Sequence, residues 1–439
     1  MLNIIRVTQE WQRAGVHYVR TEAMVKGFHI PLEKEFDQND TPDTLYVLAL
    51  DDVLPVATCR LHILDETTAK IERVCVLEQY RGKKVGKKLI QAAERWLGEL
   101  GIRKILITSR DEAVGFYEKL GYKADWSQTE KGGIFTTVLT EKNISCLTIP
   151  FGAEKGELPV AANRYRLLWT PACPWAHSQI IVLKLLGLDQ VISIGTANPR
   201  RTEKGWEFSL DDGGIDPVLK IRYLTEIYEE TDPDYTGRAT VPAVVDLKTR
   251  RVVNHDYFKL TNDWETVWKP FHKEGAPDLY PKELRTEIDE LNHILLHEIS
   301  NAIDKAGLAA TQEEYEKNYE LVFTRLDWLE ERLSRSRYLF GNHITDSDVR
   351  LYVTLARFDA AYYFAFRLNR NPIKEFPNLW NYAKDLYSIS QFGGTTDFEA
   401  IKIGYLLSSE KEKNPYQIVA NGPDASVWTQ PNDRQKKFL

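Results

Sequence analysis

The chain turns from a strand to a helix at residues 173–177, Cys-Pro-Trp-Ala-His, which follow the strand-like run Arg-Leu-Leu-Trp at 166–169. The apolar residues from 178 to 186 are typical of a helix. Its N-terminal amides and the positive end of its dipole would face the sulfur of Cys173 and lower the pKa of the thiol. The sequence therefore predicts that Cys173 is a nucleophile.

A proline lies inside a β-rich segment at 240–245, Thr-Val-Pro-Ala-Val-Val. Proline in a strand pattern otherwise indicates an edge or a bend, but a thioredoxin-like domain has a cis-proline that faces its active cysteine. Together with Cys173, the Val241-Pro242 step predicts a thioredoxin-like domain.

The region from 160 to 410 carries several separated motifs in a fixed order. They are Ala-Cys-Pro-Trp-Ala-His at 172–177, Gly-Trp-Glu-Phe at 205–208, Ala-Thr-Val-Pro at 239–242, Thr-Asp-Ser-Asp-Val-Arg-Leu at 345–351 and Arg-Phe-Asp-Ala-Ala-Tyr-Tyr at 357–363. This region resembles the Xi class of glutathione transferases, the glutathionyl-hydroquinone reductases. The resemblance implies a thioredoxin-like α/β domain and then an all-helical domain.

We expect the first of these domains at 161–275 and the helical one at 276–421. Helical patterns at 282–305, 312–334 and 345–368 support this division. Thr345 and Asp348 predict a capping box at the start of the last of them, which is a folding device. The polar tail at 422–439 has few apolar anchors and is either flexible or strapped over the surface.

The resemblance also implies a mechanism for the second half. In the Xi class the active cysteine attacks the sulfur of a glutathionylated hydroquinone, and a second glutathione resolves the mixed disulfide. Cys173 would take this role. Trp206, Val241 and Pro242 would contact the thiol cofactor, with the backbone of Val241 pairing with its peptide. Tyr405 would bind the substrate.

The chain departs from the class pattern at three places. At 254–256 it reads Asn-His-Asp where the class has Asn-Glu-Ser to hold the γ-glutamyl group, so His255 and Asp256 would bind the cofactor with a negative charge beside a carboxylate. Asp304 stands in place of a second phenol, which removes a hydrogen bond of about 1 kcal/mol, and the aromatic pair around Tyr405 is reduced to one. The thiol is therefore glutathione or another low-molecular-weight thiol, and the electrophile stays open.

The first 145 residues predict a mixed α/β domain. A basic, glycine-containing loop at 79–90 follows a strand and opens an amphipathic helix, and this combination forms an anion site. Gly121 caps a second helix. The strand patterns are 45–50, 54–63, 69–77 and 103–109, and the helices end near 100 and 122.

This arrangement resembles the GNAT superfamily of acetyl-coenzyme A dependent N-acetyltransferases, which have a mixed sheet. The resemblance implies that the loop binds the coenzyme pyrophosphate and that the backbone of the preceding strand pairs with the pantetheine. The matching residues are Arg81, Gly82, Lys83, Val85 and Gly86 for the pyrophosphate and Val74 and Val76 for the pantetheine. Lys84 stands where the family usually has glycine.

Two residues of this region are candidates for proton transfer. The resemblance implies that Tyr117 protonates the departing thiolate; the alternative is an aromatic residue of the core. Glu72 lies on the strand that splays to admit the acetyl group and is a candidate general base acting through water, because a free amine must lose a proton before it attacks the thioester. The alternative for Glu72 is an ion pair with Arg73 or with a lysine.

The 439 residues are too many for one ordinary domain and predict two or three cores, of α/β plus all-α class. Residues 146–160 carry two prolines and two glycines and predict a linker. The formal net charge of −7 gives no indication of the excess positive charge that binds nucleic acid. The N-terminus lacks the features of a secretory signal, and no apolar run reaches membrane-spanning length.

The cysteines and histidines indicate neither disulfides nor a metal. Cys59, Cys75 and Cys146 lie in apolar contexts, and none of the four cysteines, Cys173 included, has the spacing of a disulfide pair. This pattern predicts reduced thiols and a cytoplasmic protein. The histidines at 293 and 297 stand four apart on one helix face, as metal ligands do. Without a Glu between them in the hydrolase pattern and without a third ligand, we expect no metal site.

Three functions fit these observations. The first is a bifunctional enzyme that joins acetyl-CoA dependent N-acetylation of a small amine to Cys-dependent thiol transfer or reduction of a glutathionylated or related thiol-conjugated aromatic substrate. The second is an acetyltransferase whose transferase-like half is a dimerisation or substrate-binding module. The third is a binding protein in which both sites have decayed. We favour the first because Gly86, Tyr117 and Cys173 are all present. The resemblance implies a homodimer through the helical domain, and the acetyl acceptor stays open.

Overall fold

The computed structural model describes residues 2–438 apart from 66, 101, 133–134, 145–146, 155, 234, 236 and 408–415. The chain forms two compact units, Met1–Thr148 and Ile149–Leu439. Cys59, Cys75 and Cys173 are free thiols. Cys146, which the sequence also predicts to be reduced, lies outside the described residues.

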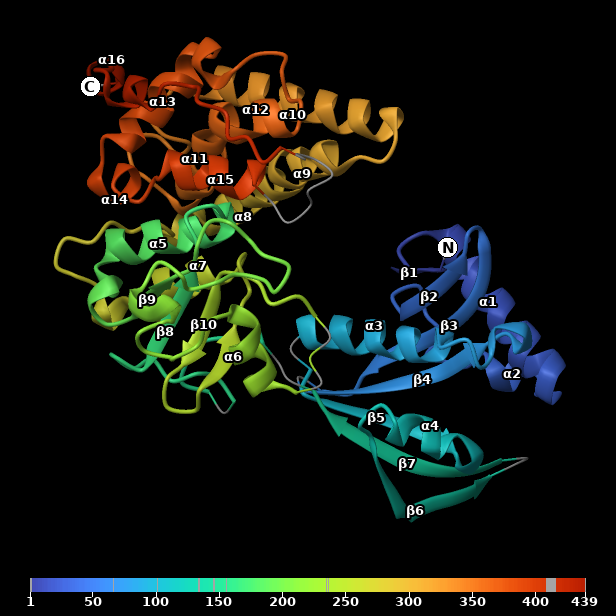
Figure 1. Ribbon diagram of the computed structural model, residues 1–439. Helices are drawn as coiled ribbons and strands as arrows, with labels where there is room; N and C mark the ends of the chain where they lie inside the picture. The colour runs from blue at the N-terminus through green and yellow to red at the C-terminus, as the bar shows by residue number, and fades with distance from the viewer. Residues whose placement is uncertain are drawn as a thin grey trace. The chain divides into compact units, whose positions relative to one another are not determined.

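The first unit is built on a seven-stranded sheet with the strand order β1-β2-β3-β4-β5-β7-β6 (Figure 1). Its neighbouring strands are antiparallel except for β4 and β5, so the sheet is mixed, as predicted. Its elements are β1 (Leu2–Arg6), α1 (Glu10–Arg20), a π-helical turn (Thr21–Lys26), α2 (Leu32–Glu35), β2 (Leu45–Asp51), β3 (Leu54–Ile63), β4 (Thr68–Val76), α3 (Val85–Glu99), β5 (Lys104–Arg110), α4 (Val114–Glu118), β6 (Lys123–Gly132) and β7 (Phe135–Asn143).

Helices cover both faces of this sheet because its inner strands are apolar on both sides. Along β2, Tyr46 and Leu48 pack with Val16 of α1 in one cluster. Val47 and Ala49 pack with the apolar side of α3 in another. Successive side chains of a strand point to opposite faces, so α1 and α3 lie on opposite faces of β2.

The parallel strands β4 and β5 pair only near their N-terminal ends, from Thr68 opposite Lys104 to Lys70 opposite Leu106. β4 continues to Val76 with no further pair to β5 among the described residues, and in Figure 1 the two strands diverge. The opening leaves backbone groups of β4 available to a ligand, because each of them needs a hydrogen-bond partner.

The second unit begins with a four-stranded sheet of order β11-β10-β8-β9, in which β8 and β9 are parallel and the other pairs antiparallel. Cys173 lies between β8 and α5, and the Val241-Pro242 peptide bond is cis. The thioredoxin-like fold is therefore confirmed. Its elements are β8 (Tyr165–Trp169), α5 (Pro174–Leu186), β9 (Ser193–Thr196), α6 (Leu224–Thr231), β10 (Ala243–Asp246), β11 (Arg251–Asn254) and α7 (Leu260–Glu265).

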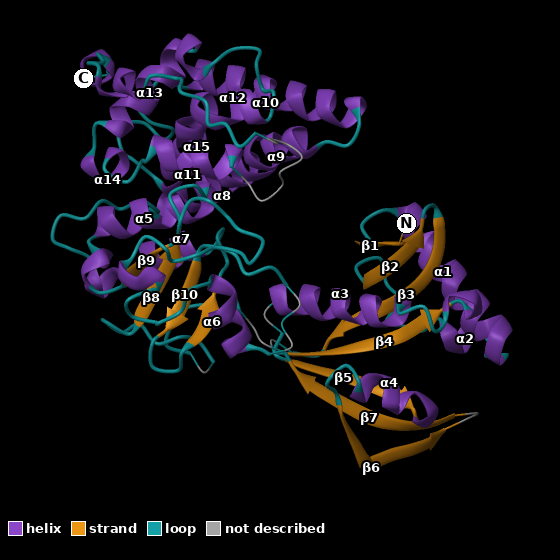
Figure 2. Cartoon of the chain, in the orientation of Figure 1, coloured by secondary structure: helices purple, strands orange, loops and turns teal. Residues whose placement is uncertain are grey.

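The described chain after β11 is helical, as Figure 2 shows in purple. The predicted capping box of α11 is present, since Asp348 Oδ2 accepts the backbone amide of Thr345 at 2.8 Å. The elements are α8 (Arg285–Ile294), a π-helical turn (Leu295–Ser300), α9 (Asn301–Leu308), α10 (Gln312–Arg332), α11 (Asp346–Arg357), a second π-helical turn (Phe358–Tyr362), α12 (Tyr363–Ala365), α13 (Pro377–Tyr387), α14 (Ser390–Gly393), α15 (Phe398–Leu406) and α16 (Arg434–Lys437). The all-helical second half is therefore confirmed.

The structure differs from the predicted linker at 146–160. From Ile149 on, the segment belongs to the second unit, and the Ile149 amide donates to the Val253 carbonyl at 3.0 Å. Phe151 is 2% exposed, and its ring centroid lies 5.1 Å from that of Trp264. The prolines and glycines predicted a linker, but from Ile149 on a backbone hydrogen bond to β11 and the buried ring of Phe151 against α7 hold the segment on the second unit.

The described part of the C-terminal tail is strapped over the helices. Trp428 is 5% exposed and its ring centroid lies 4.9 Å from that of Trp380. Arg434 is 1% exposed, so it is buried as deeply as the core. Its guanidinium donates to the carbonyl oxygens of Leu333, Ser336, Arg337 and Asn378. Of the two alternatives for the tail, the structure supports the strapped one.

Replacing Arg434 by methionine should lower the free energy of unfolding by about 3 kcal/mol, because backbone carbonyls around it lose a charged donor that they cannot replace with water. Urea unfolding followed by tryptophan fluorescence measures this. Lys436→Met, at an exposed position two residues away, is the matched control. Equal stability of the two variants would contradict the anchoring role.

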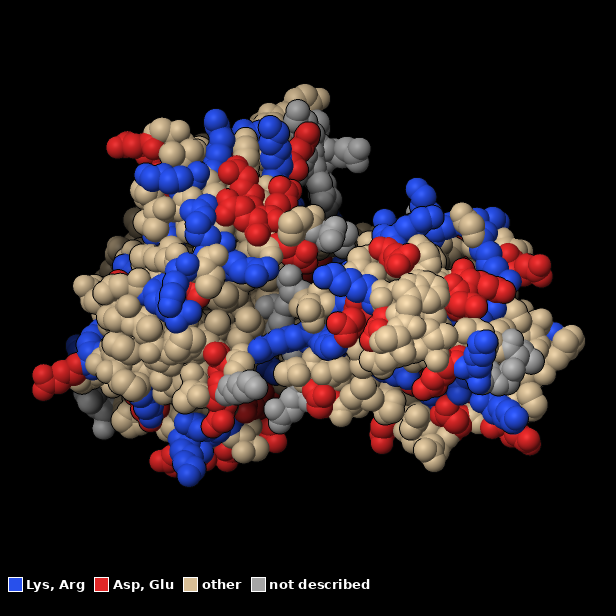
Figure 3. Space-filling view, turned by 90° about the horizontal axis from the view of Figure 1, so that it is seen from below, with Lys and Arg blue, Asp and Glu red and all other residues tan. Residues whose placement is uncertain are grey.

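The surface carries both signs of charge. On the face drawn in Figure 3, blue and red side chains are interspersed and neither sign forms a continuous stripe. In the described part of the chain, no helix combines the length and the apolar character needed to cross a bilayer.

Candidate active sites

A cleft of about 780 Å³ opens between β4 and β5 in the first unit. It brings together most of the residues that the sequence assigned to acetyl transfer, namely Glu72, Val74, Val76, Arg81, Gly82, Val85, Gly86 and Tyr117. Lys83 is not among its lining residues. The ammonium of Lys83 instead lies 5.3 Å from the ring centroid of Tyr80.

Two residues in the left-handed conformation shape the loop before α3. Gly82 has φ 74°, and Lys84, the N-cap residue of α3, has φ 63°. Left-handed backbone costs a residue with a Cβ roughly 1–2 kcal/mol, which explains why glycine would suit the position of Lys84. The tight turn is kept, and Lys84 adds a positive charge to the lining beside the N-terminal amides of α3. Such a site fits a phosphate group.

Gly86 allows α3 to approach its neighbours closely. A Cβ built on Gly86 would lie 3.3 Å from Cζ of Phe116 and 3.6 Å from Cγ2 of Val76. The carbonyl of Val76 accepts a hydrogen bond from Nε of Arg81 at 3.2 Å. This hydrogen bond ties the end of β4 to the loop.

Tyr117 is buried in the wall of the cleft, with 7% of its surface exposed. Its ring lies edge-on to Phe116, with centroids 5.0 Å apart. Burial, and then the nearby thiols of Cys59 and Cys75, raise the pKa of its hydroxyl well above the ordinary value. The hydroxyl therefore keeps its proton at neutral pH and is suited to donate it to a leaving group.

Glu72 is half-buried and ion-paired, but its partner is not Arg73. Oε2 of Glu72 accepts hydrogen bonds from Nε and Nη2 of Arg60 at 3.1 and 2.7 Å. Nζ of Lys70 lies 3.7 Å from the other oxygen, Oε1. Arg73 instead donates to Asp37 at 2.7 Å. Of the two ion pairs expected for Glu72, the one with Arg73 is not formed. The one with a lysine is present, but its nitrogen–oxygen distance of 3.7 Å to Lys70 is long.

This cleft also has an aromatic wall that the sequence motifs do not indicate. The guanidinium carbon of Arg110 lies 4.6 Å from the ring centroid of Phe28 and 5.1 Å from that of Phe135. All three residues line the cleft. They are far apart in the sequence and belong to no motif, so no local signal indicates them.

In the second unit, Cys173 is the N-cap residue of α5. Its thiol donates to the carbonyl oxygen of Val241, with Sγ 3.5 Å away. Val241 precedes the cis bond to Pro242. The fold thus brings Cys173, Val241 and Pro242 together at one place.

The prediction that the pKa of Cys173 is lowered is wrong, because the pKa is raised overall. Burial, the largest cause, raises the pKa of the thiol, and the charge of Asp304 raises it further. The amides of Ala176 and Trp175 and the charge of Arg357 lower it. The helix N-terminus acts in the predicted direction, but burial outweighs it.

Arg357 of α11 holds the loop before the nucleophile, a role that the sequence did not reveal. It is fully buried, and its Nε donates to the carbonyl of Ala172 at 3.1 Å. Its Nη1 lies 3.2 Å from Nδ1 of His177. Because arginine only donates, Nδ1 is the acceptor and Nε2 of His177 donates to Thr395 at 2.8 Å. Burial, and then the charge of Arg357, lower the pKa of His177 and keep it neutral.

Tyr405 belongs to an aromatic wall that is fuller than the sequence indicated. Its hydroxyl lies 3.2 Å from that of Tyr362, and Phe366 stacks on Tyr362 with centroids 5.6 Å apart. Gly404 packs so closely on Ala172 that a Cβ there would collide with it. The contact joins the residue before Tyr405 to the residue before the nucleophile, so the wall adjoins the thiol.

His255 is linked to the turn that carries the cis-proline. The hydroxyl of Tyr228 donates to the carbonyl of Thr240 at 2.9 Å and lies 3.1 Å from Nδ1 of His255. Burial lowers the pKa of His255 to about 4. His255 is therefore neutral at pH 7 and offers hydrogen bonds rather than charge.

Asp304 of α9 has no hydrogen bond or ion pair to another described residue, although it is half-buried. Burial and, further, the charge of Asp304 raise the pKa of Cys173, Tyr362 and Tyr405. The carboxyl is therefore close to the thiol and to the aromatic wall. Burial raises the pKa of Asp304 itself to about 6.

The stability of the second unit should depend on pH through Asp304. Its pKa of about 6 in the folded chain lies above the ordinary value, so the folded state binds the proton more strongly and loses stability as the pH rises from about 4 to about 6. Asp304→Asn should therefore raise the free energy of unfolding by about 2–3 kcal/mol at pH 7.5 and change it little at pH 4. Urea unfolding at both pH values tests this, with the exposed Asp212→Asn as control. An equal gain at both pH values would indicate packing rather than charge.

Three further residues show no role in the structure. Trp206 lies between β9 and α6, and no contact among the described residues joins its indole to Cys173; its place at the thiol cofactor stays a prediction. The rings of His293 and His297 lie 4.2 Å apart. Among the described residues no group of three or more His, Cys, Asp or Glu side chains could hold a metal ion.

Both units match known families. A model of the acetyltransferase (GNAT) family matches residues 10–122, and a model of the glutathione S-transferase C-terminal domain matches residues 312–385. A protein of Bacillus subtilis (strain 168) that carries an acetyltransferase name is 33% identical over 148 residues, which are 33% of this chain and 100% of that protein.

The second unit has relatives among glutathione-dependent enzymes. The glutathionyl-hydroquinone reductase YqjG of Escherichia coli (strain K12) is 35% identical over 278 residues, covering 63% of this chain and 84% of its own. Its glutathione-bound structure matches with a TM-score of 0.61 over 65% of this chain and 92% of that one. A Xi class glutathione transferase of Natrialba magadii matches at 32% identity with a TM-score of 0.63, over 66% of this chain and 90% of that one.

The fold, the cysteine at the helix start and these matches define an enzyme with two fused parts. The chain belongs to the Xi-class glutathione transferases and glutathionyl-hydroquinone reductases, and it carries a GNAT-family acetyltransferase domain ahead of that part.

Proposed function

We propose that the chain is a bifunctional enzyme, in which an acetyl-CoA dependent N-acetyltransferase of a small amine is joined to a Cys173-dependent reductase of a glutathionylated or related thiol-conjugated aromatic substrate. The observation that carries the proposal is the thiol of Cys173, 3.5 Å from the carbonyl of Val241 beside the cis-proline. The alternative, an acetyltransferase whose second half is only a dimerisation or substrate-binding module, would not need the buried Arg357 that holds the loop before this thiol.

In the thiol half, the thiolate of Cys173 attacks the sulfur of the conjugate. A sulfur–sulfur bond forms as the bond from sulfur to the aromatic carbon breaks, and that carbon keeps the electron pair and takes a proton. A second thiol then attacks the mixed disulfide. It leaves as a disulfide with the thiol taken from the conjugate, and the thiolate of Cys173 is restored. Burial keeps the hydroxyls of Tyr362 and Tyr405 protonated, so they can donate hydrogen bonds to phenolic oxygens.

In the acetyl half, acetyl-CoA supplies an activated acyl group. The loop at 81–86 and the first amides of α3 bind the pyrophosphate, and the backbone of β4 at 74–76 pairs with the pantetheine. Oε1 of Glu72 accepts a proton from the acceptor through water, and Tyr117 donates a proton to the departing sulfur. The wide cleft, the left-handed loop and the close approach at Gly86 support this assignment.

The identity of the thiol depends on Asp256. Its Oδ1 accepts the amides of Phe258 and Lys259 at 3.0 and 3.1 Å, so the carboxylate caps its own turn. The carboxylate of Asp256, next to His255, would repel the carboxylate of a γ-glutamyl group. A serine hydroxyl at this position would instead donate a hydrogen bond to that ligand carboxylate. We therefore propose glutathione as a thiol that the site accepts weakly, or a low-molecular-weight thiol without that carboxylate.

Asp256→Ser should lower the dissociation constant of glutathione about tenfold, which corresponds to about 1.4 kcal/mol, because it replaces a like charge by a donor. Calorimetric titration of the full chain with glutathione measures it. Asp256→Asn is the matched control, since its amide oxygen can still accept the amides of Phe258 and Lys259 while the charge is gone. If neither variant binds glutathione more tightly, the charge of Asp256 does not select the thiol.

Two assays of the purified chain test the bifunctional proposal. The first follows thiol-dependent reduction of a glutathionyl-hydroquinone by chromatography of the products. The second titrates acetyl-CoA by calorimetry. Turnover together with coenzyme binding is expected. Coenzyme binding without turnover, with glutathione or with a thiol that lacks the γ-glutamyl group, would favour the acetyltransferase-with-module alternative.

We also propose a homodimer through the helical part, as the resemblance to the Xi class implies, and a cytoplasmic location, which the free thiols of Cys59, Cys75 and Cys173 support. Light scattering after size-exclusion chromatography gives the oligomeric state. A monomer at micromolar concentration would contradict the dimer.

A further inference from the structure

We infer that the amine acetylated by the first unit is a free α-amino acid, recognised through both its ammonium and its carboxylate. The inference rests on the proposed acetyltransferase function and names the acceptor class for it. It is carried by a second, charged cavity beside the acetyl-CoA cleft and by the two charged side chains there that keep unused hydrogen-bonding capacity.

The cavity has a volume of about 270 Å³ and shares Ile71, Glu72, Arg73 and Thr108 with the cleft. The shared residues make it the natural place for an acceptor that must reach the thioester. Its volume is at or below the lower end of small-molecule sites, roughly 300 Å³. The acceptor is therefore small. The side chains that line the cavity are mostly charged.

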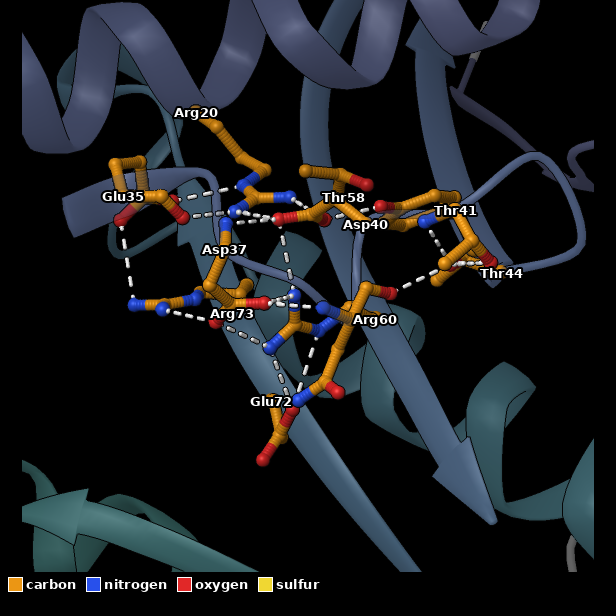
Figure 4. Close-up of polar contacts among 12 residues, drawn as sticks. Arg20, Glu35, Asp37, Asp40, Thr41, Thr44, Thr58, Arg60, Glu72 and Arg73 are labelled. Atoms are coloured by element: carbon orange, nitrogen blue, oxygen red, sulfur yellow. Dashed lines mark hydrogen bonds and ion pairs between the residues drawn. The ribbon is translucent and has the colours of Figure 1, made fainter. Parts of the chain in front are cut away.

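Most of these charges are committed to one another (Figure 4). Arg60 is 2% exposed; its Nη1 donates to Asp37 at 2.7 Å, and its Nε and Nη2 donate to Oε2 of Glu72. Asp37 also accepts from Arg73. The hydrogen bond from Arg60 is the largest cause that lowers the pKa of Asp37 far below its ordinary value. Arg60, Asp37 and Arg73 therefore form a rigid wall and have little capacity left for a ligand.

Two charged groups beside this wall remain available. In Figure 4 the interactions of Glu72 with Arg60 end on one carboxylate oxygen, and the other oxygen is turned away from the network. Among the described residues, the cation beside this oxygen, Oε1, is Nζ of Lys70 at 3.7 Å; the side chain of Glu72 is 18% exposed and that of Lys70 is 29% exposed. Both line the cavity.

Lys70 and Glu72 are two residues apart on β4 and therefore point to the same face of the sheet. They offer one ammonium and one carboxylate oxygen side by side. An α-amino acid carries the complementary pair on one carbon, so its ammonium can meet Glu72 while its carboxylate meets Lys70. A polyamine would bring a second positive charge against Lys70, which is unfavourable.

The same contact sets up the chemistry. The ammonium loses one proton to water held by Glu72, and the nitrogen forms a bond to the acyl carbon as the carbon–sulfur bond breaks. The nitrogen then loses a second proton, the departing sulfur takes one from Tyr117, and one of the two protons released by the nitrogen restores the Tyr117 hydroxyl. One ammonium and one thioester thus give one amide, one thiol and one proton in solvent.

The experiment measures coenzyme release by the full chain with the free L-amino acids, with the methyl esters of those that react, and with spermidine. We expect kcat/KM for a free amino acid to exceed that of its ester at least about tenfold, as one charge-assisted hydrogen bond provides. Lys70→Met should raise KM for the free amino acid by a similar factor and leave the ester unchanged. Calorimetric titration of the same amino acid in the presence of coenzyme A should show the same loss of affinity.

Lys104→Met is the control, because Lys104 lies on β5 in an ion pair with Glu141 and outside the cavity. The inference is overturned if esters or spermidine react as well as the free amino acids, or if acetyl-CoA binds but no amino acid is acetylated. If acetyl-CoA itself does not bind, the proposed acetyltransferase function fails first and the inference with it. Binding of acetyl-CoA therefore separates the two failures.

Discussion

Replacing Cys173 by serine is expected to lower thiol-dependent reduction of a glutathionyl-hydroquinone by more than about 10³-fold, the scale seen when a covalent nucleophile is removed. A serine hydroxyl stays protonated near neutral pH and cannot form the mixed disulfide. Serine is a favourable N-cap residue, so α5 should keep its start. Chromatography of the products measures the loss.

The control for this variant is Cys59→Ala, which removes a fully buried thiol in the core of the first unit. It should keep the reductase activity, and both variants should keep acetyl-CoA binding. Since burial raises the pKa of Cys173, the rate of the unaltered chain should rise with pH as the thiolate forms. Residual turnover above a few per cent in Cys173→Ser would show that another group is the nucleophile.

The two folds could be predicted because their signals are local. A proline at the first position of a helix is pre-organised for it, so the step from Cys173 to Pro174 defined the start of α5 without knowledge of its neighbours. The basic loop at 81–86 likewise carries its own turn residues and opens a helix of its own. Each pattern needs only a few consecutive residues.

The partners of the site residues could not be predicted because they depend on strand register and burial. Arg60 lies opposite Glu72 in the pairing of β3 with β4, but a register shift between Thr58 and Arg60 interrupts that pairing. A sequence pattern does not reveal such a bulge. The sign of the pKa shift at Cys173 likewise depends on how deeply the thiol is buried, and local sequence gives only the opposing effect of the helix.

Replacing Tyr117 by phenylalanine is the second large effect that we expect, a fall of about 10²-fold in kcat for acetyl transfer with little change in the affinity for acetyl-CoA. The hydroxyl of Tyr117 makes no hydrogen bond to another described residue, so its loss leaves no partner unsatisfied and should cost the fold little. The effect should therefore appear in the chemical step, where the departing sulfur needs a proton. Calorimetric binding of acetyl-CoA together with the rate of coenzyme release separates the two quantities.

Tyr122→Phe is the matched control, because Tyr122 is also buried and its ring centroid lies 5.9 Å from that of Tyr117, yet it does not line the cleft. It should leave kcat within about twofold, as a change outside the reacting groups does. Equal losses in the two variants would mean that Tyr117 supports the wall rather than the reaction. A loss confined to Tyr117→Phe would identify its hydroxyl as the proton donor, because the two variants remove the same atom from neighbouring rings of one core.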